Sequence, residues 1–374
     1  MSTSGELTAE ASSRRSRAGE KRQRFGAAEL AIVLSRYRLG PLDAVRDFPR
    51  GSSRAPKAII RDTSKRLFLL KRRARGRDTL RRVGFCHAVQ LHLARHDYPL
   101  PRLIPTRQKQ TMLDWQGQVY ELFEFVRGEQ YDGSTQATGE AGRALGLMHR
   151  LLDGYEPENP EITPRGSYHA AKAVGTAMRQ APQTLRDTGL APAEQEASVQ
   201  RMIDFLEGVY DRAAEEVEGL GLAGWPEQVI HSDWHPGNML FQGGQVAAVV
   251  DYDSARLQQR VIDAANGALQ FSILGGGTDP ADWPEKIDID RFKHFLAGYE
   301  SELPLSRAEL AALPWLMIEA LIAEAVVHVA ASGSFARLSG VDCLRMVERK
   351  VKWLETHADH LVAAAEGAAP PKSG

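Results

Sequence analysis

The segment at residues 231–238, HSDWHPGN, brings several residue types that can do chemistry into one short stretch. Asp233 lies between His231 and His235, and Asn238 follows a Pro-Gly pair. An apolar, strand-like run precedes the segment. Three interpretations are open: a metal site, a turn without chemistry, or the catalytic loop of a phosphoryl-transfer enzyme.

A zinc site is the least favoured of these interpretations. His231 and His235 are four residues apart, a spacing that places two imidazoles on one face only when the backbone is helical. The Pro-Gly pair favours a loop instead, and no acidic residue stands beside His231. A turn in which His231 and Asp233 only hydrogen-bond the loop backbone stays open on this segment alone.

Asp251 brings a second carboxylate to the same neighbourhood. It lies 13 residues after Asn238, at the end of the strand-like run QVAAVVD, and the turn Gly243-Gly244 separates that run from the strand-like MLF. Two short strands about this turn would return Asp251 to the side of Asn238. Such oxygen ligands suit Mg²⁺ carrying a nucleotide triphosphate, because phosphates and waters supply its other ligands. Asp233 is then left to face a substrate hydroxyl as base or orienting group.

The bulk composition is that of an ordinary globular protein of two domains or two lobes. The chain has 374 residues, 43% apolar and 25% charged. Cys86 and Cys343 form no CxxC motif, which is typical of a reducing compartment. The sequence predicts no membrane span, because it has no run of about 18 apolar residues. The N-terminus lacks the apolar core of a secretory signal, so we expect a cytoplasmic protein.

The charge is distributed unevenly. Residues 1–110 contain 26 Lys and Arg against 9 Asp and Glu, whereas the remaining residues contain 21 against 39. A basic half would suit phosphates and an acidic half a cationic substrate or metal, although a solubility pattern explains the counts equally well. Residues 1–24 have 6 basic and 3 acidic residues without interleaved aromatic residues, so nucleic-acid binding is not expected.

Hydrophobic periodicity and chain breakers predict an α+β fold. A helix is expected over 27–40, three strands between 43 and 73, a helix over 78–96 and a hairpin over 112–126. From residue 138 the pattern becomes mainly helical, with short strands around the segment described above and a breaker-rich loop at LGGGTDPADWP. The layout is a small sheet lobe followed by a large helical lobe with β-hairpins at its mouth.

HSDWHPGN followed by VVDYD resembles the aminoglycoside phosphotransferase / choline kinase-like family, which has a protein-kinase-like fold with two lobes. The family carries an H-x-D-x-x-x-x-N loop and a later Asp on a strand. The resemblance implies that Asp233 is the catalytic Asp, that Asn238 and Asp251 bind Mg²⁺, and that His231 organises the catalytic loop. It covers most of residues 27–360, but only 231–253 is specific.

The resemblance also implies the domain boundaries. The small, nucleotide-phosphate-binding lobe would span 25–126, and the large lobe with the metal and acceptor site would span 127–366. The tails at 1–24 and 367–374 are expected to be disordered.

The nucleotide would bind the first lobe. Gly51, Ser52 and Ser53 fit a hairpin tip whose backbone N–H groups approach phosphates, although a plain strand turn fits as well. Lys71 ends the apolar strand LFLLKRR at the family's expected place for the lysine that pairs with the α- and β-phosphates. A register slip of one residue would give Arg72 that role. Otherwise Arg72 and Arg73 are expected to be solvated.

The hinge between the lobes would be YELFEFVRG, where backbone groups of Glu124, Phe125 and Val126 would bind adenine. One departure from the family concerns the partner of Lys71. Kinase-like proteins supply a Glu from the next helix, but residues 78–97 contain none. Asp78 or Gln90 would hold the lysine instead, or nucleotide positioning would be weak.

These residues predict an ATP- and Mg²⁺-dependent O-phosphotransferase. Its acceptor would be a small-molecule hydroxyl on an amino alcohol, an aminoglycoside or a sugar-like compound. A kinase-like nucleotide-binding protein with weak or no catalysis is the alternative, and the missing Glu favours it.

Four further side chains have two interpretations each. Asp253 would assist the metal or, preferably, cap the next segment, and Trp234 would wall the acceptor pocket or pack in the core. Glu324 and His328 are i,i+4 neighbours in the apolar stretch MIEALIAEAVVHVAAS. They would contact the substrate or, preferably, form an internal salt bridge.

Overall fold

The computed structural model describes residues 22–49, 51, 54–76, 79–157, 167–190, 193–277, 279–335 and 338–368. The sequence predictions for Ser52, Ser53 and Asp78, and for most of both tails, fall outside these ranges. Arg22 and Arg24, which the sequence assigned to the first tail, contact Gly51 and Asp47.

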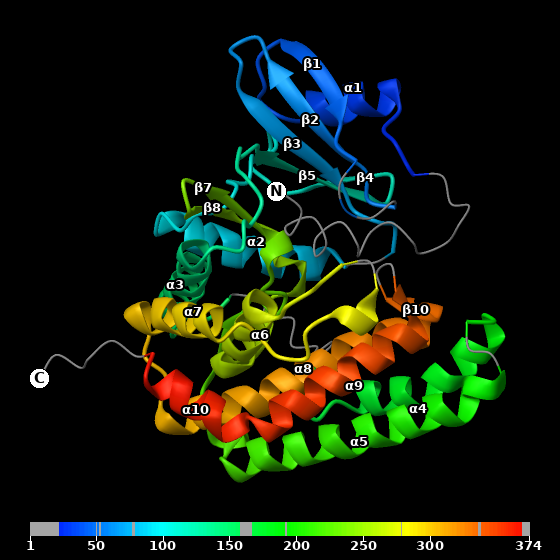
Figure 1. Ribbon diagram of the computed structural model, residues 1–374. Helices are drawn as coiled ribbons and strands as arrows, with labels where there is room; N and C mark the ends of the chain where they lie inside the picture. The colour runs from blue at the N-terminus through cyan, green and yellow to red at the C-terminus, as the bar shows by residue number, and fades with distance from the viewer. Residues whose placement is uncertain are drawn as a thin grey trace, which may run out of the picture.

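The small lobe is a five-stranded antiparallel sheet with strand order β1-β2-β3-β5-β4 (Figure 1). Its elements are α1 (Ala27–Ser35), β1 (Leu42–Asp47), β2 (Lys57–Asp62), β3 (Leu67–Arg72), β4 (Leu113–Trp115) and β5 (Gln118–Glu124). One sheet face packs on α1 through Val33, Leu34, Tyr37, Ala58, Ile60, Phe68, Leu70, Tyr120 and Leu122. Alternate residues therefore point to the opposite face, toward the large lobe.

Two rows of residues cross this opposite face. Ile59, Leu69 and Phe123 pair across β2, β3 and β5, and so form an apolar, half-buried row. Lys57, Lys71 and Glu121 form the next row, two residues further along. An apolar row beside a charged row suits a ligand that has both a flat ring and a charged tail.

Helix α2 (Leu80–Arg95) follows the first three strands, and the Thr79 side chain caps it by accepting the Arg82 N–H at 3.1 Å. Its buried side chains Phe85, Val89 and Leu93 belong to the core of the helical lobe. Figure 1 shows α2 below the sheet and above that lobe. The helix is thus part of the surface on which the sheet rests.

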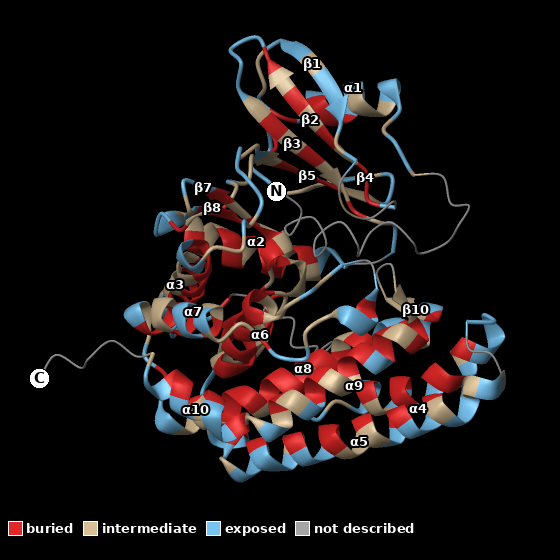
Figure 2. Ribbon diagram, in the orientation of Figure 1, coloured by how far each residue is buried: buried red, intermediate tan, exposed pale blue. Residues whose placement is uncertain are grey.

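The large lobe is helical. Its helices are α3 (Thr135–Leu151), α4 (Lys172–Asp187), α5 (Glu196–Gly219), α6 (Arg260–Ser272), α7 (Ile289–Glu302), α8 (Arg307–Ser332), α9 (Gly340–Thr356) and α10 (Ala358–Glu366). Figure 2 shows their buried faces turned inward; α4, α5, α6, α9 and α10 pack on α8, whereas α3 packs mainly on α7. By length and composition α8 could cross a membrane, but 78% of that window is buried inside the protein, as in a core helix.

Short strand pairs lie between the lobes. β6 (Glu227–Ile230) pairs with β9 (Arg256–Gln259), and β7 (Met239–Gln242) pairs with β8 (Gln245–Val249). A further two-residue pair, β10 (Ser334–Phe335) with β11 (Leu338–Ser339), lies near α9. The sequence predicted β6, β7 and β8 but not β9. The predicted α+β, two-lobe architecture is confirmed, although α1 ends at Ser35 rather than at residue 40.

Candidate active site

The loop at 231–238, which the sequence predicts to be the catalytic loop, follows β6 and is held by Asp263. This carboxylate, on the first turn of α6, accepts the N–H of His231 at 2.7 Å and the N–H of Ser232 at 2.8 Å. Ser232 has φ of 64°, in the left-handed region that non-glycine residues avoid. The two hydrogen bonds offset that strain. Sequence reasoning missed Asp263; its only signal was an acidic residue among the apolar residues of RVIDAANGAL.

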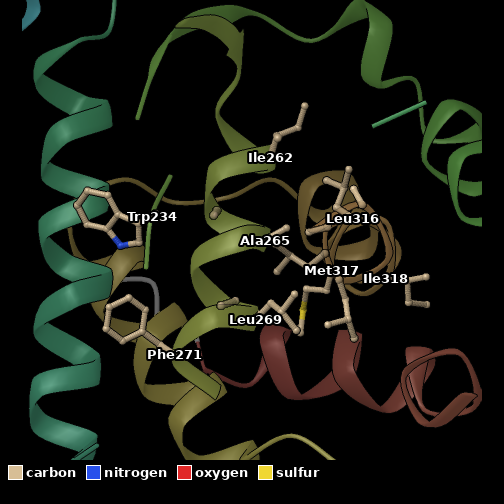
Figure 3. Packing of buried hydrophobic residues seen from close by; sticks show 14 of the residues in the cluster. Trp234, Ile262, Ala265, Leu269, Phe271, Leu316, Met317 and Ile318 are labelled. Atoms are coloured by element: carbon tan, nitrogen blue, oxygen red, sulfur yellow. The ribbon is translucent and has the colours of Figure 1, made fainter. Parts of the chain in front are cut away.

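His231 lies entirely inside the protein. Its ring packs against Trp234 and Tyr252, with centroids 5.4 and 5.0 Å away, and its Nε2 lies 3.2 Å from the Val250 carbonyl oxygen. Trp234 is also fully buried, and Figure 3 shows it in the core near α6. The packing interpretation of Trp234 therefore holds, and the side chain walls no acceptor pocket.

Asp233 is partly exposed to solvent, with 46% of its side chain accessible. Its Oδ2 accepts from Asn238 Nδ2 at 2.9 Å, and Asn238 Nδ2 also donates to the Asp233 carbonyl at 3.0 Å. Burial disfavours ionisation, but the hydrogen bond and charge of His235 and the Asn238 amide hold the pKa of Asp233 below its ordinary value. The carboxylate is therefore ionised and fixed in orientation.

The two histidines of the loop have separate partners. His235 Nδ1 accepts the Gly237 N–H at 3.0 Å, and its Nε2 lies 3.6 Å from Asp233 Oδ1. Within the described ranges, no group of three or more His, Cys, Asp or Glu residues is arranged to hold a metal ion. His231 Nε2 lies at the Val250 carbonyl and His235 Nε2 at Asp233, so the two imidazoles have different partners.

Asp251 and Asn238 are neighbours in space. The Val250 N–H donates to the Asn238 carbonyl at 2.9 Å, because the β7–β8 hairpin returns the chain to this point. Asp251 follows with φ of 65°, and 43% of its side chain is exposed. Since the Asn238 amide nitrogen donates to Asp233, its amide oxygen is free to accept or ligate. An amide oxygen and a carboxylate are the donor types that fit Mg²⁺.

Lys71 reaches from the sheet to this carboxylate group. Its Nζ lies 2.8 Å from Asp253 Oδ2, 3.9 Å from Glu121 Oε2 and 4.0 Å from Asp251 Oδ1. Burial opposes its charge, but the charges of Asp253, Glu121 and Asp251 raise the pKa of Lys71 well above its ordinary value. Lys71 is therefore a protonated cation that faces the cleft, in the register that the sequence favoured over Arg72.

The acidic partner missing from the helix comes from strand β5. Glu121 is fully buried directly across the sheet from Lys71. It accepts from Arg73 Nε and Nη2, both at 2.9 Å, and lies 2.7 Å from His87 Nε2 on α2. Although burial opposes its charge, Lys71, His87 and Arg73 lower the pKa of Glu121. Gln90, one predicted substitute, donates instead to the Cys86 carbonyl.

The prediction that Arg72 and Arg73 are solvated is wrong. Arg73 has only 4% of its side chain exposed and bridges Glu121 and Asp253, the latter at 2.5 Å. Arg72 pairs with Glu29 of α1 at 2.6 Å. Both arginines are therefore bound to carboxylates, Arg72 to one of the small lobe and Arg73 to one of each lobe.

Asp253 does not cap the next segment, contrary to the preferred sequence interpretation. Its carboxylate accepts from Lys71 and Arg73, and its carbonyl accepts from Arg82 Nη2 of α2 at 2.7 Å. The cations of β3 and α2 thus converge on one residue of the large lobe. Asp253 therefore joins the two lobes through these hydrogen bonds.

The hinge leaves one backbone donor available. The Glu124 N–H donates to the Arg102 carbonyl and the Phe125 N–H to the Leu67 carbonyl, whereas the Val126 N–H has no acceptor in the described part of the chain. Of the three predicted adenine-binding residues, Val126 is therefore the one that can donate. Phe48 covers this segment by packing edge-on against Phe125, with centroids 6.2 Å apart.

Glycine is required where the hinge meets the large lobe. A Cβ on Gly128 would lie 2.7 Å from Leu240 Cβ, and the adjacent Glu129 exchanges backbone hydrogen bonds with Phe241 of β7. The predicted hairpin tip residue Gly51 has φ of 83°, and its carbonyl accepts from Arg22 at 3.0 Å. Gly128 is thus required by close packing, and Gly51 by its positive φ.

The predicted salt bridge between Glu324 and His328 is not formed. The ring of the exposed His328 contacts the Glu324 carbonyl, and the Glu324 carboxylate accepts from Gln270 Nε2 at 2.7 Å. Burial opposes protonation of His235, but Asp233, and then Glu324 and Asp251, raise its pKa. The charge of Glu324 thus acts on His235, while its carboxylate is hydrogen-bonded to Gln270. Glu319 is fully buried and pairs with His169 at 2.8 Å.

Comparison with known proteins identifies the family. The family model "Phosphotransferase enzyme family" matches residues 45–313. The homoserine kinase of Caulobacter sp. (strain K31) is 27% identical over 292 residues, covering 77% of this chain and 81% of the relative. The homoserine kinase of Rhizobium etli (strain CIAT 652) is 25% identical over 295 residues, covering 77% and 80%.

Solved structures show the same fold. An aminoglycoside phosphotransferase from Alicyclobacillus acidocaldarius has a TM-score of 0.64 at 14% identity, covering 92% of this chain and all of that one. A microcompartment-associated aminopropanol kinase has a TM-score of 0.63 at 14% identity, covering 90% and 98%. The resemblance drawn from residues 231–253 is confirmed. The chain belongs to the phosphotransferase enzyme family and is a kinase that phosphorylates the hydroxyl group of a small molecule.

Proposed function

We propose that this protein transfers the γ-phosphate of ATP to the side-chain hydroxyl of a hydroxy amino acid of the homoserine type, with Mg²⁺ as the metal. The observation that carries the reaction type is the orientation of Asp233, an ionised, partly exposed carboxylate that is held by the Asn238 amide. The relatives named homoserine kinases support the choice of acceptor.

Asp233 accepts a hydrogen bond from the acceptor hydroxyl and aims its oxygen at the phosphate. Its lowered pKa keeps it ionised, so it acts mainly by orienting the nucleophile and takes the proton as the new bond forms. Asp263 acts through the loop, because it fixes the backbone of His231 and Ser232. His231 is a positioning residue, since its buried ring has no access to the reacting atoms.

Asn238 and Asp251 would hold Mg²⁺, which neutralises the charge of the phosphates when it is bound. Lys71 would contact the phosphates from the sheet, and Glu121 and Asp253 keep its ammonium in place. Val126 would bind adenine through its N–H, with the ring lying on Ile59, Leu69 and Phe123. Each group acts by position and charge, as phosphoryl transfer requires.

Charges beside Asp233 fit a zwitterionic acceptor. Glu324, whose charge helps to raise the pKa of His235, would bind an ammonium group. Arg256 on β9 is buried, and it lies near enough to Asp263 and Asp233 for their charges to offset part of the pKa decrease that burial causes. A guanidinium there would bind a carboxylate. An amino alcohol without a carboxylate would use only the Glu324 half of this pair.

The test is an acceptor series assayed with Mg-ATP. Homoserine, the matched amino alcohol without a carboxylate, and an aminoglycoside would each be incubated with the protein, and phosphorylated product would be detected by mass spectrometry. We expect kcat/KM to be highest for homoserine, by about tenfold or more, because the amino alcohol loses one charged contact. A higher kcat/KM for the amino alcohol or the aminoglycoside would refute the zwitterion assignment while keeping the kinase assignment.

A further inference from the structure

Lys57 lies directly across the sheet from Lys71. The two residues are register partners in the antiparallel pair of β2 and β3, so their side chains leave the same face, with Cβ atoms roughly 5 Å apart. Both are half-buried on the face that is turned toward the large lobe. Like charges in this arrangement repel one another.

The two lysines are compensated unequally. Lys71 has the carboxylates of Asp253, Glu121 and Asp251 within 4.0 Å. The Lys57 ammonium has no hydrogen bond or ion pair with any residue that the structure describes. Burial, and then the charge of Lys71, lower the pKa of Lys57. The charges of Asp251, Asp253 and Glu121 offset part of this decrease, but no carboxylate among the described residues contacts the Lys57 ammonium directly.

Lys57 also lies under the tip of the β1–β2 hairpin. A Cβ on Gly51 would be 3.1 Å from Lys57 Nζ, so the ammonium lies against Gly51. The apolar row of Ile59, Leu69 and Phe123 lies two residues further along the strands, about 7 Å away. A purine on the apolar row would therefore place a polyphosphate tail at the two lysines.

We propose that Lys57 is a second phosphate-binding lysine, and that the polyphosphate of the bound nucleotide lies between it and Lys71. The inference rests on the proposed nucleotide site and adds to it a contact that neither the motif nor the family resemblance predicted. The bound anion removes the repulsion between the two ammonium groups. In the free protein this repulsion lowers the stability of the fold, so the protein is less stable than it would be without Lys57. Relief of the repulsion then contributes to the binding energy of the nucleotide.

The experiment compares Lys57→Gln with Lys65→Gln, which removes the same charge from the β2–β3 turn at the far end of the same hairpin. Lys65 pairs with Asp43 on the surface. Binding of adenosine, ADP and a non-hydrolysable ATP analogue would be measured by calorimetry with Mg²⁺. For Lys57→Gln we expect the ATP analogue to bind about tenfold more weakly and adenosine to bind within about twofold of wild type. Lys65→Gln should match wild type for all three ligands.

Thermal unfolding gives a second readout that a merely structural lysine would not produce. Without nucleotide, Lys57→Gln should melt at or above the wild-type temperature, and the rise on adding the ATP analogue should be smaller than in wild type. Lys57→Arg should recover most of the nucleotide-dependent rise. Unchanged analogue binding, or an equal loss for adenosine and the analogue, would overturn the assignment of Lys57. A wild-type protein that binds none of the three ligands would overturn the proposed function itself, and this inference with it.

Discussion

The catalytic loop and the phosphate-binding face of the sheet achieve their geometry in opposite ways. The loop is held mainly through its backbone: the Asp263 carboxylate accepts two N–H groups, and the Asn238 carbonyl accepts the N–H of Val250, which follows β8. The sheet face is held by charged side chains, since Lys71 and Arg73 share Glu121 and Asp253. These backbone hydrogen bonds remain when a loop side chain such as Asp233 changes, whereas a charge network is altered by the loss of any of its members.

This difference predicts that substitutions in the loop separate activity from stability, and that substitutions on the sheet face change both. The Asp233 carboxylate is exposed and supports no other element. Glu121 is buried and bonded to Arg73, which follows β3, and to His87 of α2. The variants below test that contrast.

Asp233→Asn should have the largest effect on activity. The amide cannot accept the hydroxyl proton, so kcat should fall by about 10³-fold or more, while the affinity for nucleotide stays close to that of wild type. Steady-state kinetics and calorimetry measure the two quantities. Asp204→Asn, an exposed carboxylate on α5, is the matched control and should leave both unchanged. Retention of full activity by Asp233→Asn would refute its catalytic assignment.

Glu121→Gln should affect both activity and stability. It leaves Arg73 buried with one carboxylate in place of two, so the free energy of unfolding should fall by about 3 kcal/mol. KM for ATP should rise by about tenfold, because Lys71 loses a charge that holds it. Denaturant unfolding and kinetics test this, with Asp114→Asn on the exposed side of β4 as control. A variant as stable as wild type would show that the charge network does not hold the sheet face together.

His235→Asn should have the smallest effect, and the effect should depend on pH. Burial lowers the pKa of His235, but the hydrogen bond and charge of Asp233 outweigh burial and raise it. The protonated ring therefore stabilises the folded protein below the unfolded-state pKa of about 6.5. That stabilisation is lost as the pH rises through the higher folded-state pKa. The pair is partly exposed, so the variant should lose only about 0.5 kcal/mol at about pH 5.5 and less at about pH 9. A loss that grows toward alkaline pH would contradict the assigned charge states.

The sequence predicted the loop better than the sheet face, for a physical reason. Asp233, Asn238 and Asp251 lie within one strand–loop–hairpin segment, so their spacing is enough to bring them together. Glu121 lies 50 residues beyond Lys71, and only the pairing of β3 with β5 makes them partners. The sequence therefore gave no sign that the partner of Lys71 lies on β5 rather than on the helix. Arg73 was predicted to be solvated because no residue near it in the sequence indicates its burial.

The elements around the loop and the sheet face could be predicted from the sequence only in part. The α+β architecture followed from periodicity, because alternation and helical spacing are local properties. β9 was not predicted, because it forms a strand only by pairing with β6. Residues 231–255 separate the two strands in the sequence. Asp263, 32 residues after His231, was missed because its role depends on where α6 packs against the loop.

The attachment of α2 to the large lobe limits how this kinase can be switched. In protein kinases the corresponding helix swings to make or break the partner of the phosphate-binding lysine. Here that motion would draw Phe85, Val89 and Leu93 out of the helical core, at a cost of about 2 kcal/mol for each side chain. Control of activity would instead have to act on the strands or on the hinge, so an inhibitor aimed at a displaced α2 would have no target in this protein.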